Sequence, residues 1–144
     1  PYRRQRQMCI RDRQLGFKLV VDPSVNYSGY FDARSRSITM KQIDDSVYHE
    51  LGHFLAFIAG NVDKTASFQS IFAAEKANVT AFNKAYVTQN ASEYFAESVK
   101  DYILNNASLK STRPQTYAAV QNALNQITDA QIAKIQKIYG AFWN

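Results

Sequence analysis

The sequence predicts a single α+β domain that is mostly helical, with a small β-sheet near its N-terminus. Its 144 residues are about one domain's worth, and 46% hydrophobic with 20% charged residues is a globular composition. Short apolar runs bounded by turn residues lie between residues 17 and 40. Beyond them, apolar residues recur at helical spacing almost to the end of the chain. These observations together predict the fold class.

Two segments are predicted to be extended. Residues 17–21 (FKLVV) have the composition of a strand. Residues 29–40 (GYFDARSRSITM) are predicted to form two short strands around a polar turn at 32–35. The second of these strands consists of Ser37, Ile38, Thr39 and Met40.

The rest of the chain is predicted to be helical. Asp44 or Asp45 can cap the first of these helices, and Gly60-Asn61 can end it. Apolar residues at helical spacing predict further helices over 65–77 and 90–104. Two later sequence features mark helix starts: Pro114, which suits a first turn, and Thr128-Asp129-Ala130-Gln131, a capping box before the terminal helix.

The helix that follows Asp45 contains His49-Glu50-Leu51-Gly52-His53, which fits the pattern H-E-x-x-H. Two imidazoles one helical turn apart can bind one zinc ion, at about 2.0–2.1 Å from each nitrogen. Glu50 beside them can take a proton from a water that zinc makes acidic. The alternative is a pair of histidines that are exposed, or hydrogen-bonded in the core, without a metal.

A catalytic zinc needs a third protein ligand, and since the chain has two histidines, that ligand must be a carboxylate. The best context is 90–104 (NASEYFAESVKDYIL), where Glu93 and Glu97 lie one turn apart, opposite an apolar stripe. If this helix packs on the histidine helix, Glu93 faces both imidazoles. Glu97 could then hold the free nitrogen of a ligand histidine.

Two alternatives concern the same carboxylates. Glu93 could be the third residue of a capping box that begins at Asn90, with Glu97 merely solvated. Asp63, which follows the histidine helix, is the second candidate for the third zinc ligand.

The pairing of HELGH with SEYFAES about forty residues later resembles the anthrax lethal factor-like metallopeptidases, which include the secreted Pro-Pro endopeptidases. SFQSIFAAEK, KAYVTQNASE and RPQTYAAV are also similar to this family, so the resemblance covers roughly residues 15–127. It implies a zincin-like fold and a zinc metalloendopeptidase of the gluzincin type, with one zinc ion bound by His49, His53 and Glu93.

The resemblance also implies roles for other residues. Glu50 is the general base, and Tyr86, seven residues before Glu93, points into the active site as a second catalytic residue. An edge strand before the motif helix, which would be 37–40, pairs with an extended protein or peptide substrate. Members of the family differ in substrate, so a proline-rich substrate is one option. The resemblance further implies secretion by a bacterium.

Charge and composition exclude other function classes. Five arginines and Asp12 place +4 of the net charge of +5 in residues 1–13, so the remainder is nearly neutral and offers no basic stripe for nucleic acid. We assign residues 1–13 to a tail outside the fold and 14–144 to the catalytic domain. An Arg-rich arm that contacts an acidic partner is the alternative. No apolar run approaches the length of a membrane span. We also expect the protein to be a monomer.

A rival to the peptidase hypothesis is a partner-recognition domain of a toxin-like protein that has the same fold but has lost zinc and activity. The intact H-E-x-x-H motif and Glu93 favour the enzyme. Zinc content would distinguish the two.

Overall fold

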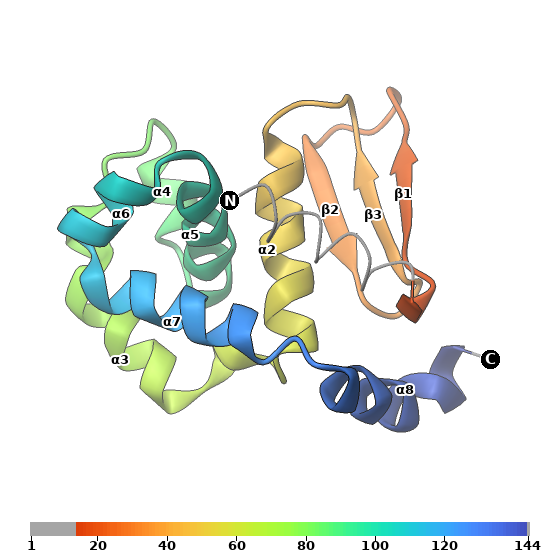
Figure 1. Cartoon of the computed structure of the whole chain (residues 1–144). Helices are drawn as coiled ribbons and strands as arrows, with labels where there is room; N and C mark the ends of the chain where they lie inside the picture. Colours follow the sequence, from red (N-terminus) through yellow and green to blue (C-terminus); the bar gives the residue numbers. More distant parts are fainter. Residues whose placement is uncertain (1–13, 144) are drawn as a thin grey trace.

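The computed structural model describes residues 14–143. Three strands precede a series of helices (Figure 1). The elements in chain order are β1 (Lys18–Val21), β2 (Gly29–Asp32), β3 (Ser37–Met40), α2 (Ser46–Ile58), η1 (Val62–Lys64), α3 (Ala66–Glu75), η2 (Lys76–Asn78), α4 (Lys84–Val87), α5 (Ala91–Leu104), α6 (Asn106–Thr112), α7 (Pro114–Asn125) and α8 (Asp129–Trp143). The predicted α+β class, mostly helical with a small sheet before the helices, is confirmed.

The sheet has the order β1-β3-β2, with β1 parallel and β2 antiparallel to β3. The expectation that 37–40 is an edge strand is therefore wrong, because the backbone of β3 is paired on both sides. A strand paired on both sides has no free edge to offer a substrate. In the described chain the edge beside α2 belongs to β2, and Figure 1 shows β2 between β3 and α2.

Helix α2 lies between the sheet and helices α3 to α7, with α8 across one end of the molecule (Figure 1). Its start is held by Asp44, whose Oδ1 accepts a hydrogen bond from the Ser46 backbone N–H at 2.9 Å. Gly60 (φ 82°) and Asn61 (φ 58°) end it in left-handed conformations, as predicted from the Gly-Asn pair. Both predicted boundaries of this helix are thus confirmed.

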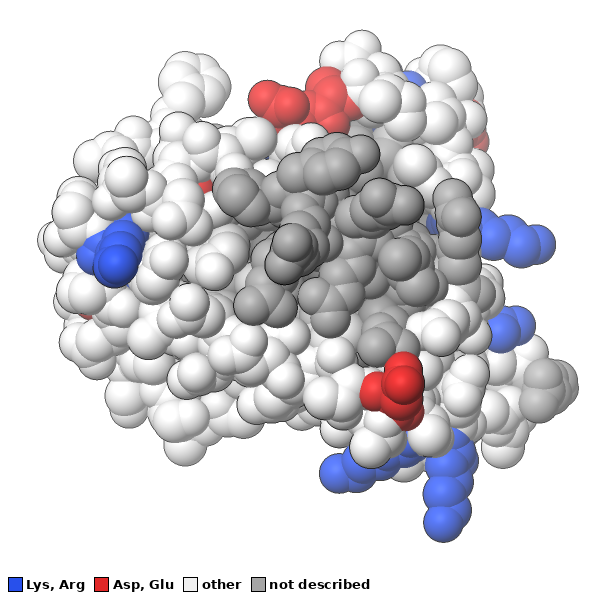
Figure 2. All heavy atoms as spheres, viewed as in Figure 1, with Lys and Arg blue, Asp and Glu red and all other residues white. Residues whose placement is uncertain are grey.

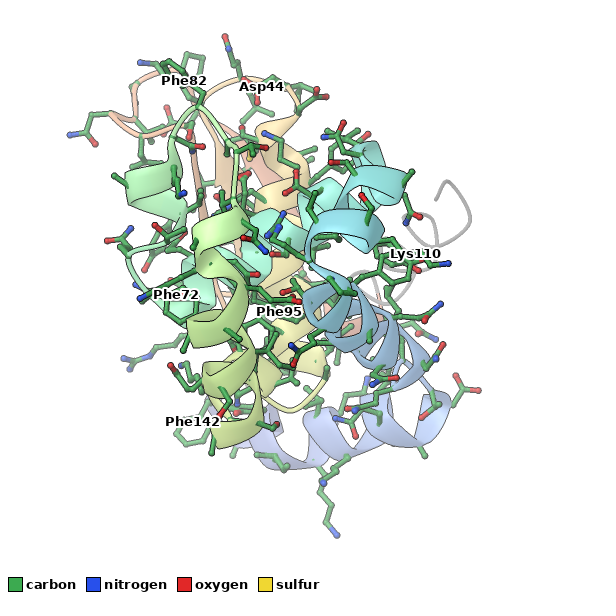
Figure 3. The ribbon with its side chains drawn as sticks, turned by 90° about the vertical axis from the view of Figure 1, so that its left-hand side faces the viewer. Asp44, Phe72, Phe82, Phe95, Lys110 and Phe142 are labelled. Atoms are coloured by element: carbon green, nitrogen blue, oxygen red, sulfur yellow. The ribbon has the colours of Figure 1, made fainter. Side chains whose placement is uncertain are left out.

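Helices α2 and α5 pack in close contact where Gly52 meets Ala96. A Cβ atom on Gly52 would lie 2.6 Å from both the Cα and the carbonyl oxygen of Ala96. The absence of a side chain at Gly52 therefore sets the distance between these helices. Phe54 and Leu55 of α2 and Phe95 of α5 are fully buried, and Phe95 lies in the interior between the helices in Figure 3.

The other predicted helices are also observed. Helix α3 covers most of 65–77, α7 begins at Pro114 and α8 begins at Asp129. At the start of α8, Thr128 Oγ1 accepts the Gln131 N–H at 3.2 Å, but the Gln131 side chain donates instead to the Ile58 carbonyl at 2.9 Å. Half of the predicted capping box is therefore formed, and the other half joins α8 to the end of α2.

The predicted tail at 1–13 lies outside the described residues. Among the described helices, none is long and apolar enough to cross a membrane. On the face shown in Figure 2, the Lys and Arg side chains lie at the edges and do not form one continuous patch among the coloured atoms.

Candidate metal centre and active site

The candidate centre is built on the face of α2 that points towards α5. His49 and His53 lie one turn apart, with ring centroids 5.0 Å from each other. The His49 side chain is 10% exposed and that of His53 is 18% exposed. Because His49 and His53 are held on a rigid, buried helix, their ring nitrogens are positioned before any ligand arrives.

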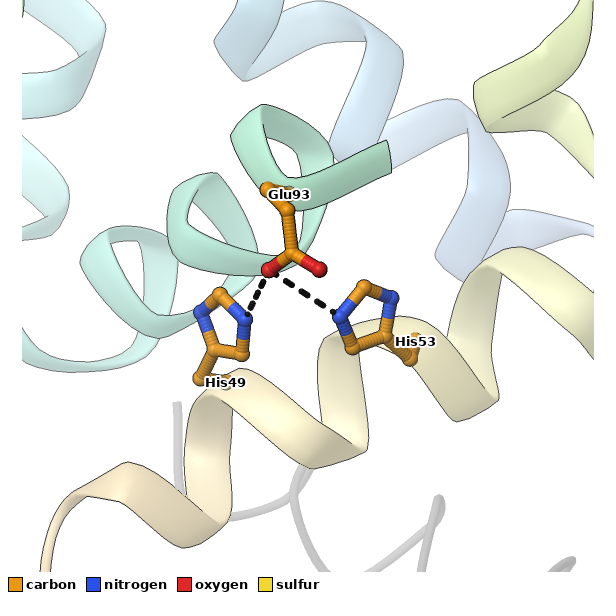
Figure 4. Close-up of side chains that lie close together, drawn as sticks. All are labelled: His49, His53 and Glu93. Atoms are coloured by element: carbon orange, nitrogen blue, oxygen red, sulfur yellow. Dashed lines mark hydrogen bonds and ion pairs between the residues drawn. The ribbon is translucent and has the colours of Figure 1, made fainter. Parts of the chain in front are cut away.

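Glu93 comes from the first turn of α5. The Asn90 side chain accepts the Glu93 backbone N–H at 2.8 Å, as in a capping box, while the Glu93 carboxylate turns towards the histidines. Its Oε2 lies 2.8 Å from His49 Nε2 and 3.5 Å from His53 Nε2 (Figure 4). The backbone N–H of Glu93 takes part in the helix cap, while its carboxylate is free to act as a metal ligand. The two interpretations of Glu93 are therefore compatible.

Among the described His, Cys, Asp and Glu side chains, one group of three could hold a metal ion: His49, His53 and Glu93. Their ligand atoms lie within 4.8 Å of one another. Asp63, the second candidate for the third ligand, is buried in η1 and does not belong to this group. The structure thus brings the histidines together with Glu93.

Glu97 lies one turn further along α5, on the other side of the His49 ring. Its Oε2 is 3.7 Å from His49 Nδ1, and its Oε1 is 3.7 Å from Lys100 Nζ. The carboxylate therefore faces the nitrogen of His49 that is not directed at Glu93. This is the position in which a carboxylate can orient a ligand imidazole and fix its tautomer.

The electrostatics of the metal-free site follow from these contacts. Burial lowers the pKa of His49, but hydrogen bonds to Glu93 and Glu97 outweigh it and raise that pKa to about 9. Burial raises the pKa of Glu93, but its bonds to His49 and His53 outweigh burial and hold that pKa far below its usual range. The same opposition, with His49 as partner, lowers the pKa of Glu97. A proton on His49 thus takes the place of a cation between the carboxylates of Glu93 and Glu97.

Glu50 on α2 and Tyr86 on α4 complete the site. Glu50 is buried, and burial raises the pKa of its carboxyl group. Tyr86, on the short helix α4, is 54% exposed, and its ring centroid is 6.4 Å from that of His49. Burial and the charge of Glu93 raise the pKa of the Tyr86 phenol, which keeps it protonated at neutral pH.

Two cavities adjoin this site and share Gly29, Glu50 and Tyr86 in their walls. The larger one, of about 260 Å³, extends towards Lys100, and the smaller one, of about 160 Å³, extends towards Phe31 and His53. The site is therefore accessible on both sides of Glu50.

The three convergent side chains fit zinc in their chemistry and spacing. Two imidazole nitrogens and one carboxylate oxygen are a common ligand set for catalytic zinc. Donor atoms around a tetrahedral zinc lie about 3.3 Å apart, for bonds of about 2.0–2.1 Å. The separations of 2.8 and 3.5 Å from Glu93 Oε2 to the two histidines bracket this value.

Comparison with known proteins assigns the chain to a protein family. Residues 30–123 match the family described as "Anthrax toxin lethal factor, N- and C-terminal domain". The chain belongs to this family. It is also 41% identical over 78 residues to the Pro-Pro endopeptidase of Clostridioides difficile (strain 630). That match covers 51% of the chain and 34% of the relative, so the chain spans about a third of that protein's length.

The family membership confirms the resemblance drawn from HELGH and SEYFAES. The matched range contains the catalytic and metal-binding residues that this resemblance implies: His49, Glu50, His53, Tyr86 and Glu93.

Among the lining residues that sequence reasoning missed, Gly29 and Lys100 contact carboxylates of the site. Gly29 begins β2, and a Cβ atom there would lie 2.9 Å from both Cγ and Oε1 of Glu50. Lys100 lines the larger cavity and contacts Glu97. A glycine at the start of a predicted strand is a sign of close approach by another group and could have marked Gly29. The spacing of Glu97 and Lys100 at i and i+3 could have marked the second.

Proposed function

We propose that this domain is a zinc-dependent endopeptidase of the gluzincin type, with the zincin-like arrangement that its family implies. The observation that carries the proposal is the convergence of His49, His53 and Glu93 beside a buried Glu50 in an accessible cleft. The name of the Pro-Pro endopeptidase relative supports peptide-bond hydrolysis as the reaction. A bacterial, extracellular setting accompanies the proposal, and the lack of cysteine in residues 14–144 is compatible with it.

His49, His53 and Glu93 would hold one zinc ion, with Glu97 orienting His49 through its second nitrogen. When bound, zinc supplies a Lewis acid that polarises a carbonyl group and lowers the pKa of a water to about 7. The support for this ligand set is the observed spacing of the three side chains.

Glu50 would act as general base. Burial shifts its pKa towards neutral pH, and a base whose pKa is near the working pH both accepts and returns a proton readily. It would take the proton of the attacking water and pass it to the leaving nitrogen of the cleaved peptide bond. Because Gly29 has no side chain, β2 can approach Glu50 closely, and a Cβ atom at this position would clash with the carboxylate.

Tyr86 would donate a hydrogen bond to the substrate carbonyl oxygen as negative charge develops on it. The phenol is protonated at neutral pH, so it is a donor. Its position in the wall of both cavities, opposite Gly29 and Glu50, supports contact with a substrate that crosses the site.

The substrate would bind in an extended conformation along β2, which takes the role first expected for 37–40. Lys41 N–H donates to the Ser28 carbonyl at 3.1 Å. Since antiparallel pairs alternate between bonded and non-bonded residues, the N–H and C=O groups of Gly29 and Phe31 point away from β3. These groups can pair with the backbone of a peptide at the edge nearest α2.

The test combines zinc analysis with a cleavage screen. The purified protein should contain one zinc per chain and cleave members of a peptide library, as detected by mass spectrometry, and a chelator should abolish the cleavage. A zinc-free protein that cleaves nothing, even after zinc is added, would refute the proposal and favour a recognition domain that has lost its metal.

A further inference from the structure

The larger of the two cavities beside Glu50 has a polar wall. Apart from the site residues, it is lined by Ser28, Ser46, Asn83 and Lys100. The smaller cavity is lined instead by Tyr30 and Phe31. An extended substrate that crosses the line of Gly29, Glu50 and Tyr86 would place a side chain on each side of it, so the two cavities meet neighbouring residues of the substrate.

Lys100 provides the cation in the wall of the larger cavity. Its Nζ lies 3.7 Å from Glu97 Oε1, and its side chain is 30% exposed. An ammonium group has three donors, so one contact to Glu97 leaves others available. Asn83 and the Ser28 hydroxyl add further donors and acceptors around it, while the Ser46 hydroxyl donates to Asp44.

We infer that the larger cavity selects a substrate residue next to the scissile bond whose side chain ends in a hydrogen-bond-accepting oxygen, as in Gln or Glu, and that Lys100 donates to this oxygen. The inference rests on the proposed endopeptidase function. It names Lys100 as a specificity-determining residue.

Other side chains fit the cavity less well. A Leu side chain would displace water from Lys100 and Asn83 without replacing their hydrogen bonds, which costs binding energy. A Lys side chain would place a second ammonium group beside Lys100. Between the favoured pair, Glu would meet the carboxylates of Glu50 and Glu97 as well as Lys100, whereas Gln meets no like charge. The same two carboxylates would attract a Lys side chain, but Lys has no acceptor for Lys100. We therefore expect Gln first and Glu second, ahead of both Leu and Lys.

The experiment uses matched peptides that carry Gln, Glu, Leu or Lys on one side of the scissile bond, and a second set varied on the other side. A hydrogen bond to a charged group predicts kcat/KM for Gln about 10-fold or more above Leu on the side that faces the cavity. In Lys100→Met this preference should shrink to within about threefold, and in Lys100→Glu the Lys peptide should become the best. The matched control Lys110→Met, on α6 and outside the cavity lining, should keep the parental ranking.

Binding to the Glu50→Gln variant, measured by fluorescence anisotropy, separates this inference from the proposed function. If the library screen finds no cleavage even with zinc added, but the variant binds the Gln peptide more tightly than the Leu peptide, the peptidase proposal fails and the pocket assignment stands. If the peptides are cleaved at rates independent of the varied residue, or if Lys100→Met slows all peptides alike, the assignment is overturned. The latter result would mean that Lys100 acts only through Glu97. If neither the cleavage assay nor the binding assay distinguishes the Gln peptide from the Leu peptide, the pocket assignment is overturned as well.

Discussion

A single methyl group at Gly52 should open the proposed metal site, because this glycine sets the distance between the two helices that carry the proposed ligands. In Gly52→Ala the new Cβ would lie 2.6 Å from the Cα and the carbonyl oxygen of Ala96. Ordinary contacts between non-bonded carbon atoms are about 3.5–4.0 Å. Helices α2 and α5 would therefore have to separate by about 1 Å, since the obstacle is backbone and cannot rotate away.

That movement acts directly on the ligand set. Glu93 is on α5 and both histidines are on α2, so a 1 Å separation would carry the carboxylate beyond the bond lengths that zinc tolerates. Overpacking costs about 1–3 kcal/mol, and the gain in helix propensity from Gly to Ala returns up to about 1 kcal/mol. We expect a net loss of up to about 2 kcal/mol, or up to about 8 °C in Tm, and a fall in zinc affinity on the order of 10-fold or more.

Gly140→Ala is the matched control. A Cβ atom at Gly140, on helix α8, meets nothing within 4 Å. The higher helix propensity of Ala should then stabilise the Gly140→Ala variant by about 0.5–1 kcal/mol. Calorimetric melting of the metal-free proteins and competition with a zinc chelator measure the two effects. If Gly52→Ala matched the control in both Tm and zinc affinity, the claim that this glycine sets the helix spacing would be refuted.

Three further predictions concern individual groups. Glu93→Ala should lower zinc occupancy sharply in elemental analysis while Asp63→Ala should not, and the reverse result would move the third ligand to Asp63. Tyr86→Phe should lower kcat and kcat/KM alike, by about 10²–10³, with zinc content and Tm close to the parent, whereas unchanged turnover would restrict Tyr86 to packing. Because zinc binds neutral imidazole and the pKa of His49 is about 9 without metal, zinc binding at pH 7.5 should release about one proton, and affinity should rise about 10-fold per pH unit up to pH 9. Calorimetry in two buffers of different ionisation enthalpy measures the proton release, and a release of none would contradict the raised pKa.

The same pKa predicts how the stability of the metal-free protein depends on pH. The pKa of His49 is higher in the folded state than its ordinary value of 6.5, so its contribution is complete below pH 6.5 and disappears as the pH rises through 9. Glu93 acts in the opposite direction: its folded pKa is lowered, so its contribution is present above its ordinary value of 4.5 and is lost on acidification. The contribution of this pair to the stability of the metal-free protein should therefore be greatest between pH 4.5 and pH 6.5.

Local features of the fold followed from the sequence, since they depend on neighbouring residues. The periodicity around His49 and His53 predicted a helix with both imidazoles on one face, and the Gly60-Asn61 pair predicted its end. The stripe at 90–104 predicted that Glu93 and Glu97 share a face of that helix outside the apolar stripe. When two amphipathic helices pack through their stripes, residues that flank the contact lie close together, and this explains why the approach of Glu93 to both histidines could be predicted. Zinc binding by these side chains stays a prediction.

Features that depend on distant pairing could not be predicted in this way. The alternation of Ile38 and Met40 indicates a buried strand face but not which strands lie beside it, so the central position of β3 was missed. Glu75 shows the same limit. On the helical pattern it follows an apolar stripe, yet in the structure its carboxylate accepts the backbone N–H groups of Gln115 and Thr116 and so caps helix α7. No local pattern links residues forty positions apart.

The most direct test of the account is to compare the parent and Glu50→Gln in one cleavage assay at equal zinc content. Because Glu50 is not a metal ligand, the variant should bind one zinc per chain and keep its Tm, yet lose about 10²–10⁴ in kcat for every peptide that the parent cleaves. Near-parental turnover in Glu50→Gln at full zinc occupancy would contradict the assignment of Glu50 as the base, and with it the proposed mechanism.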